Sequence, residues 1–206
     1  MKTLFDLNLQ AQENLIIAKK EKLVALELKK LAKILLKKAK SREEFAKKEM
    51  ELNKVRKNLV NQNKTLLESQ VKSMEILNFS EEVIKKEERF IDYHEKAAET
   101  QIKMAKHHIE LAKIEEELAK SKLLQANSKL KVANIRIELG NIQLKYGNAM
   151  KNNSREKVKI IKARYNQKQE ELSEELKDLA EKENQVKHYQ DDVASLSSQL
   201  SQSMVK

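Results

Sequence analysis

Small residues recur every seven positions in two long segments of the chain, and this is the clearest pattern in the sequence. In the first segment they are Ala11, Ala18, Ala25, Ala32, Ala39 and Ala46. In the second they are Ala98, Ala105, Ala112, Ala119, Ala126, Ala133, Gly140 and Gly147. An apolar period of seven predicts helices that wind around each other in a left-handed supercoil, and small residues at one position allow two backbones to approach closely.

Larger apolar residues occupy the position directly before these small residues in both segments. They are Ile17, Val24, Leu31 and Phe45 in the first segment, continued in register by Leu52, and Met104, Leu111, Leu118, Val132 and Leu139 in the second. We expect these bulkier side chains to flank the close contact between the two helices.

Helix ends have to be found from capping residues, because the chain has no proline and two glycines. Thr3, Ser80 and Ser154 can each cap a helix, and Glu81 and Glu156 would place acids at the positive end of a helix dipole. The sequence therefore predicts an all-α protein with one domain over residues 1–206 and helices of roughly 3–78, 81–148 and 154–204.

Folding the first segment back on the second about Phe79 brings small residues opposite small residues. The resulting layers are Ala46/Ala112, Ala39/Ala119, Ala32/Ala126, Ala25/Ala133, Ala18/Gly140 and Ala11/Gly147. A slip of seven residues preserves most of these layers. The pattern predicts an elongated antiparallel coiled-coil hairpin, and it gives both glycines a place where close approach offsets their cost of about 1 kcal/mol in a helix.

The third predicted helix carries an apolar seam of its own at strict intervals of seven. Its members are Val158, Tyr165, Leu172, Leu179, Val186, Val193 and Leu200. Such a seam can pack on the flank of the hairpin, or it can pair with another copy of the chain or with a protein partner. Tyr165, Leu172, Leu179 and Val186 are the candidate association residues.

Positive charge is concentrated at the start of the chain, whose net charge is +10. Residues 1–60 hold sixteen Lys or Arg and eight acids, and four lysines follow the alanine positions at sevens: Lys33, Lys40, Lys47 and Lys54. Lysine attracts phosphates without the forked geometry that distinguishes bases. Four interpretations stay open. The lysines could form a solubilising flank, or they could bind lipid head groups, a nucleic-acid backbone or an acidic protein. The apolar segment from Leu4 to Ile17 favours lipid.

Chemistry typical of an enzyme is not visible in the sequence. Of the four histidines, His107 and His108 are adjacent and point about 100° apart on a helix, and no His-Glu-x-x-His motif occurs. Two glycines cannot build a phosphate-binding loop, and zero cysteine excludes thiolate ligands. We predict no catalysis, no metal, no cofactor and no small-molecule substrate.

The opening stretch Leu4-Phe5-Asp6-Leu7, followed by Ala11, Glu13, Ala18-Lys19-Lys20 and a lysine-rich run to Lys57, resembles the first helices of charged multivesicular body proteins. That resemblance covers residues 4–57 and implies a helical hairpin that polymerises on membranes. The family turns its hairpin near the position of Ser41 and ends in an acidic tail, which this chain lacks. Residues 105–133 also look like the hairpins of bacterial export-duct proteins.

These patterns together predict a cytoplasmic, non-catalytic, self-associating scaffold whose basic first helix binds an anionic surface, with peripheral membrane association. The alternatives that stay open are a protein–protein adaptor or stalk subunit of a larger assembly and a nucleic-acid-binding protein without sequence preference.

Overall fold

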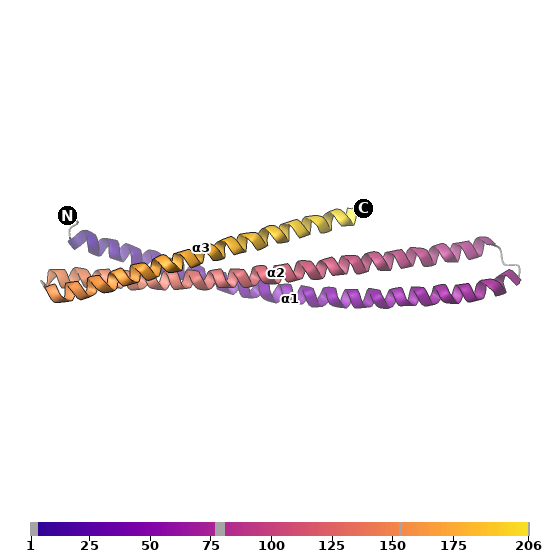
Figure 1. Cartoon of the computed structure of the whole chain (residues 1–206), viewed down its shortest axis with the longest axis horizontal. Helices are drawn as coiled ribbons and strands as arrows, with labels where there is room; N and C mark the ends of the chain where they lie inside the picture. Colours follow the sequence, from indigo (N-terminus) through magenta and orange to yellow (C-terminus); the bar gives the residue numbers. More distant parts are fainter. Residues whose placement is uncertain (1–3, 77–80, 153, 206) are drawn as a thin grey trace. The chain divides into compact units, whose positions relative to one another are not determined.

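Three long helices make up the described part of the chain. The computed structural model describes residues 4–76, 81–152 and 154–205, which form α1 (Leu4–Ile76), α2 (Glu81–Lys151) and α3 (Arg155–Val205) (Figure 1). The prediction of an all-α protein is confirmed, and the helices begin and end within three residues of their predicted limits. The predicted cap at Thr3 and the predicted turn through Phe79 and Ser80 lie outside the described residues.

The ends of α2 and the start of α3 carry the expected charges and hydrogen bonds. Glu81 and Glu82 lie in the first turn of α2, and Glu156 lies in the first turn of α3, where the helix dipole favours acids. Between the two helices, the backbone N–H of Ser154 donates to the carbonyl of Ala149 at 3.2 Å. The Ser154 carbonyl then accepts from Val158 at 3.0 Å, so Ser154 stands directly before α3 as predicted.

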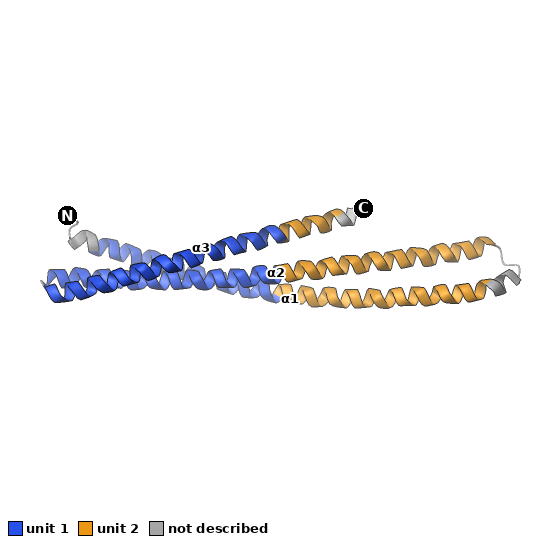
Figure 2. Cartoon of the chain, viewed as in Figure 1, with its two compact units in different colours: residues 1–37, 115–192 blue, residues 38–114, 193–206 orange. Residues whose placement is uncertain are grey.

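The chain divides into two compact units, which are described separately below (Figure 2). Unit 1 consists of Met1–Lys37 and Glu115–Asp192, and unit 2 consists of Lys38–Ile114 and Val193–Lys206. Each unit contains a segment of all three helices, and a single domain over residues 1–206 stays a prediction.

Unit 1 is a three-helix assembly. Its α1 and α2 segments are antiparallel, because Gly140 lies against Leu15 while the later Gly147 lies against the earlier Asn8. Its α2 and α3 segments are also antiparallel, as shown by Glu138–Lys168 at 2.9 Å, Lys131–Glu175 at 3.1 Å and Ser128–Asp178 at 2.9 Å. This unit therefore contains the predicted hairpin with the third helix packed on it.

Unit 2 consists mainly of two helices, the α1 and α2 segments, which run side by side in Figure 2. Their antiparallel direction follows from the ion pairs Lys57–Glu99 at 2.6 Å and Lys64–Asp92 at 3.9 Å. The third helix contributes only its last part, from Val193 onward, in which Leu200 is buried. The predicted hairpin packing is thus present in both units.

The core of both units is built from the small residues at intervals of seven, which we call the alanine seam. Its fourteen positions from the sequence pattern are Ala11, Ala18, Ala25, Ala32, Ala39, Ala46, Ala98, Ala105, Ala112, Ala119, Ala126, Ala133, Gly140 and Gly147. The twelve alanines are at most 4% exposed, and both glycines are buried. A contact this narrow buries little apolar area per residue, so close packing of the two backbones has to supply much of the stabilisation.

At the two glycines the nearest atoms of α1 belong to residues other than those of the predicted layers, whereas the ion pair Glu21–Arg136 lies within one residue of the predicted alignment. A Cβ atom built on Gly140 would lie 2.6 Å from Cγ of Leu15 and 3.4 Å from the carbonyl oxygen of Ala11, whereas the predicted neighbour was Ala18. A Cβ atom on Gly147 would lie 2.6 Å from Oδ1 of Asn8, whereas the predicted neighbour was Ala11. The larger side chain of Leu15 fills the space above the glycine, because this buries more apolar surface than an alanine would.

Candidate interaction surfaces

The four lysines predicted to contact an anionic surface are all exposed. Lys33 belongs to unit 1, and Lys40, Lys47 and Lys54 belong to unit 2. The Lys47 ammonium lies 2.8 Å from a carboxylate oxygen of Glu43, one turn earlier on α1. This ion pair is exposed to solvent, so it is weak and leaves the lysine accessible to a larger anionic surface.

A second helix adds lysine to this surface in unit 2. The hydrogen bond from Lys47 holds the pKa of Glu43 below its usual value, and the charges of Lys47, Lys113 and Lys40 lower the pKa further. Lys113 comes from α2, where Lys106 and Lys113 directly follow Ala105 and Ala112. Sequence analysis missed these two lysines, although applying the rule used for Lys33, Lys40, Lys47 and Lys54 to the second alanine segment would have found them.

An exposed apolar stripe runs along the outer side of α1 in unit 1. It consists of Leu9, Ile16 and Leu23, which stand at intervals of seven two positions before the alanine seam. All three side chains are about half exposed or more. We call these three residues the outer stripe. Lys19 and Lys20 are exposed between Ile16 and Leu23, so apolar and basic side chains share this surface.

Other residues of the apolar leading segment have different surroundings. Leu15 lies in the seam against Gly140, and Ile17 lines a groove together with Leu172 and Tyr165 of α3. The side chains of residues 4–7 lie outside the described set. The sequence pattern predicts one apolar surface from Leu4 to Ile17. In the described part of this segment, different residues face the seam, α3 and solvent.

The predicted seam of α3 lies against the hairpin within unit 1, which is one of the two possibilities left open by the sequence. Val186 is buried, and Leu172 and Leu179 line grooves that also include Ile17 and Val24 of α1. The Tyr165 hydroxyl accepts a hydrogen bond from Nε2 of Gln143 at 3.1 Å. An external partner for unit 1 would therefore have to use a different surface.

Charged contacts orient α3 on α2 in unit 1. Besides the pairs already described, Lys129 lies 3.0 Å from Glu183. Hydrogen bonds from Lys182 and then Ser128 hold the pKa of Asp178 below its usual value, and hydrogen bonds to Glu171 and Glu138 raise the pKa of Lys168. Since these groups are partly exposed, each pair contributes little energy, and their common effect is to select one alignment of α3.

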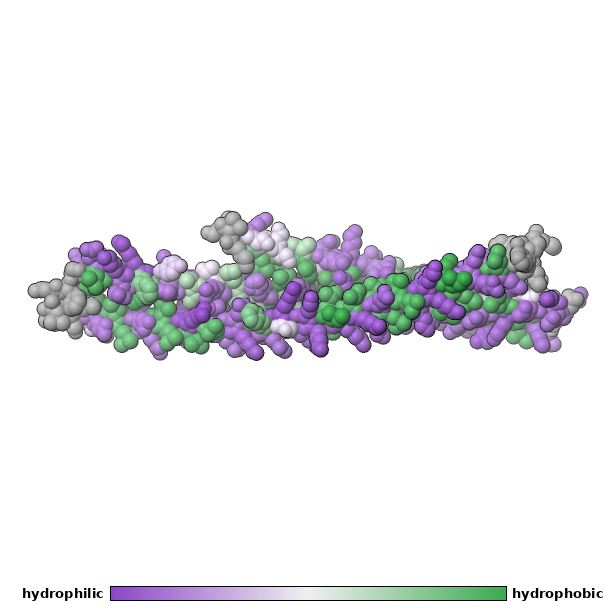
Figure 3. Space-filling view, turned by 180° about the vertical axis from the view of Figure 1, so that it is seen from behind, coloured by the Kyte–Doolittle hydropathy of each residue, from purple (hydrophilic) through white to green (hydrophobic). Residues whose placement is uncertain are grey.

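In unit 2 several bulky residues beside the alanine seam are exposed, whereas Met104 and Leu111 of α2 are half-buried. Phe45, Leu52, Leu59 and Leu66 of α1 are each more than half exposed, as are Phe90 and Tyr93 of α2. Figure 3 shows apolar side chains among hydrophilic ones on the face that it presents. We call these six residues the arm face.

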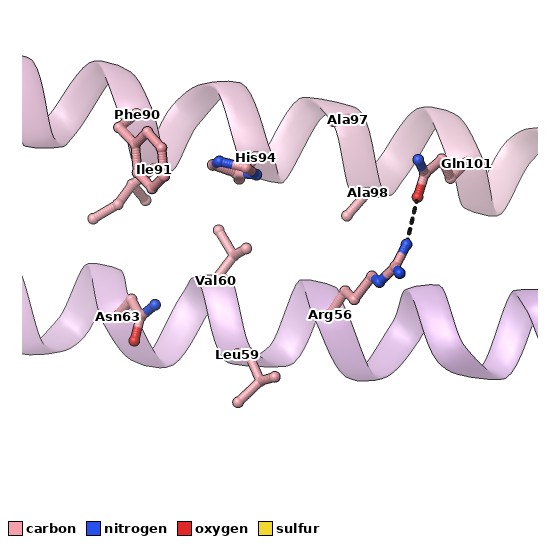
Figure 4. A pocket seen from close by; sticks show the side chains of 10 residues that line it. All are labelled: Arg56, Leu59, Val60, Asn63, Phe90, Ile91, His94, Ala97, Ala98 and Gln101. Atoms are coloured by element: carbon pink, nitrogen blue, oxygen red, sulfur yellow. Dashed lines mark hydrogen bonds between the residues drawn. The ribbon is translucent and has the colours of Figure 1, made fainter.

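A groove of about 500 Å³ lies on unit 2 between α1 and α2 (Figure 4). Phe90 and Ile91 of α2 project toward α1, and Val60 projects toward them. The Phe90 ring meets the imidazole of His94 edge-on with centroids 4.3 Å apart. At one end, Nη1 of Arg56 donates to Oε1 of Gln101 at 3.4 Å. The groove is mainly apolar, with polar groups at its margin.

The described residues include no group of three His, Asp or Glu side chains that could hold a metal ion. His107 pairs with Glu110 at 3.5 Å, and His188 pairs with Asp192 at 2.9 Å, in both cases within one helix. Within residues 4–205 as described, no helix combines the length and the hydropathy needed to cross a bilayer.

Comparison with protein-family models, curated proteins and solved structures finds no match to this chain. The resemblance of residues 4–57 to charged multivesicular body proteins stays a prediction, and so does the likeness of residues 105–133 to export-duct hairpins. Function has to be argued from the surfaces described above.

Proposed function

We propose that the protein is a non-catalytic coiled-coil scaffold that binds an anionic membrane surface peripherally through α1. The observation that carries this proposal is the outer stripe of Leu9, Ile16 and Leu23, whose side chains are exposed beside lysines on a helix held by its opposite face. Apolar residues next to lysines are the combination with which an amphipathic helix lies in a head-group interface.

The magnitudes are adequate for reversible binding. Complete burial of a Leu or Ile side chain contributes about 1.5–3 kcal/mol, so partial immersion of three such residues supplies a few kcal/mol. Each lysine close to an anionic leaflet adds about 1 kcal/mol. Because the lysine term is electrostatic, binding should weaken as salt is raised, whereas the apolar term should persist.

Vesicle co-sedimentation of the whole chain tests the proposal. We expect binding to vesicles of phosphatidylcholine with phosphatidylserine and much weaker binding to phosphatidylcholine alone. Reversing Lys33, Lys40, Lys47 and Lys54 to Glu should remove about 4 kcal/mol or more. The matched control reverses Lys157, Lys159, Lys162 and Lys177, four exposed lysines of α3, and changes the net charge by the same amount.

A second variant isolates the apolar contribution. Ile16→Asp with Leu23→Asp should abolish vesicle binding while circular dichroism shows unchanged helix content, since both positions are exposed. Equal binding to neutral and anionic vesicles, or equal losses in the α1 variants and in the α3 control, would overturn the lipid proposal. Binding to nucleic acid in preference to vesicles would favour the alternative of a non-specific nucleic-acid-binding protein.

A further inference from the structure

We infer that unit 2 is a dimerisation arm, and that the arm face packs against the arm face of a second copy of this chain. The inference rests on the proposed scaffold function, because it names the surface through which copies of the scaffold meet. It does not depend on lipid binding.

The first step is that one heptad position of α1 borders α3 in unit 1, although its side chains stay about as exposed there as in unit 2, with Ile17 at 53% and Val24 at 54%. Ile17 and Val24, each directly before a seam alanine, line grooves with the α3 residues Leu172 and Leu179. Phe45, Leu52, Leu59 and Leu66 occupy the same heptad position in unit 2, where each is more than half exposed. The arm face therefore continues, on the same helix, the set of positions that borders a helix in unit 1.

On α2 the two units differ in burial. In unit 1, Val132 and Leu139 precede seam residues and are buried, and so are Ile135 and Ile142, two positions after the seam. In unit 2 the corresponding positions include Phe90 and Tyr93, which are more than half exposed. Two aromatic residues at positions that are buried in a packed helix layer indicate a surface built to receive helices.

The second step is that the charges beside the arm face are self-complementary. At the heptad position two before the seam, α1 carries Glu44 and Glu51, whereas α2 carries Arg89, Lys96 and Lys103 with Glu82 and Glu110 at the two ends of this row, all exposed. A twofold axis parallel to the helices places α1 of one copy on α2 of the other, so acidic margins meet basic margins. A twofold axis perpendicular to the helices would place α1 on α1 and would bring like charges together.

The third step is that two arms complete a stable layer. Beside the last part of α3, each arm offers two antiparallel helices with one apolar face, and two such faces form a four-helix core. The groove of about 500 Å³ lined by Leu59, Val60, Phe90 and Ile91 would then receive side chains of the partner copy. In the arrangement favoured by charge, Glu51 of one copy lies near Lys103 of the other.

Sedimentation equilibrium and light scattering of the purified full chain test this inference. We expect a dimer at micromolar concentration. Leu52→Asp with Leu59→Asp should weaken the dimer by roughly a hundredfold or more, because a carboxylate would enter an apolar contact. Circular dichroism should show unchanged helix content, since both side chains are exposed in the single chain. The matched control is Ile16→Asp with Leu23→Asp in the outer stripe, which should leave the dimer intact.

An exchange of charges between the two helices tests whether α1 of one copy contacts α2 of the other. Glu51→Lys alone and Lys103→Glu alone should each weaken the dimer, and the double variant should restore it. A wild-type monomer at tens of micromolar, or a dimer that persists in the Leu52→Asp, Leu59→Asp variant, would overturn the inference; the second result would point to another contact, such as an exchanged α3. Failure of the lipid proposal is separate, since it is detected with vesicles and with the outer-stripe variant.

Discussion

The two units contain the same alanine seam but differ in what covers its flank. In unit 1 the flanking residues meet α3, whose residues 170–183 hold seven acids and two lysines and form ion pairs with Lys129 and Lys131 of α2. The difference in burial lies on α2, where Val132 and Leu139 are buried in unit 1 and Phe90 is exposed in unit 2, whereas the α1 flanking residues are more than half exposed in both units. In unit 2, α3 contributes only from Val193 onward. The seam of small residues therefore determines which helices pair. The bulkier residues beside the seam determine whether a further helix is needed to bury the flank of that pair.

This difference matters because an alanine seam alone is a weak core. A buried alanine removes far less apolar surface from water than a buried leucine, at about 25 cal/mol per Å². Unit 1 adds Val132, Leu139 and Val186 to its buried set, whereas the buried set of unit 2 consists mostly of alanines. We expect unit 2 to be the less stable unit when the chain is monomeric, and to gain most from association.

The largest predicted difference between the units concerns a charge placed at one heptad position. Leu139→Asp buries a carboxylate under α3 and should cost about 4 kcal/mol or more in free energy of unfolding. Phe90→Asp occupies the equivalent position in unit 2, where the side chain is exposed, and should cost less than about 0.5 kcal/mol in dilute protein. Urea denaturation of both variants measures this, and equal losses would contradict the proposed role of α3.

Much of the fold could be predicted from the sequence because its signals are local and repeated. The alanine period gave the helices and their pairing, and Ser154 with Glu156 gave the start of α3. The stagger at Gly140 could not be obtained by matching small residues with small residues, because it depends on how Leu15 fills the space above a glycine. The seven-residue period of α3 also could not predict whether its seam packs on the hairpin or on another chain, since that depends on the flanking residues of α1 and α2.

The next prediction concerns the glycines, which both lie in the unit 1 part of α2. Gly140→Ala gains about 1 kcal/mol of helix propensity. Its new methyl group would lie within 3 Å of Leu15 Cγ, and overpacking of this kind costs about 1–3 kcal/mol, so we expect a net loss of stability. Leu15→Ala in the same chain should recover part of that loss, and a double-mutant cycle from thermal unfolding measures the coupling.

Gly147→Ala provides the contrast for this prediction. Its methyl group would meet only the end of the Asn8 side chain, which can rotate away, so stability should stay constant or rise by up to about 1 kcal/mol. Similar losses at Gly140 and Gly147, or the absence of coupling with Leu15, would favour the originally predicted layers over the observed stagger.

A smaller effect is expected at Asn53, which interrupts the alanine seam in unit 2. Its side chain is buried, and its Oδ1 accepts a hydrogen bond of 3.4 Å from Nη1 of Arg56, one turn away on the same helix. Asn53→Ala should stabilise unit 2 by about 0.5–1 kcal/mol, because a polar residue in the seam is replaced by the best helix former. The converse change in unit 1, Ala32→Asn, should lower the free energy of unfolding by about 1–3 kcal/mol. Hydrogen exchange resolved by residue measures both, and slower exchange should be confined to unit 2 in Asn53→Ala.

The smallest effect should appear at acid pH and should distinguish α3 contacts from hairpin contacts. Because hydrogen bonds from Lys182 and Ser128 lower the pKa of Asp178 in the folded chain below its usual value, they stabilise unit 1 at pH values above the pKa of the unfolded chain. This stabilisation is lost as the pH falls through the folded pKa.

Ser128→Ala should raise the pKa of Asp178 and lower stability at neutral pH, with no difference from wild type in strong acid. Carboxyl NMR titration measures the pKa, and Glu99 in unit 2, whose pKa is lowered by Lys57, should titrate unchanged. A shift at Glu99 as large as that at Asp178 would show that Ser128 acts through the stability of the whole chain and not through its bond to α3.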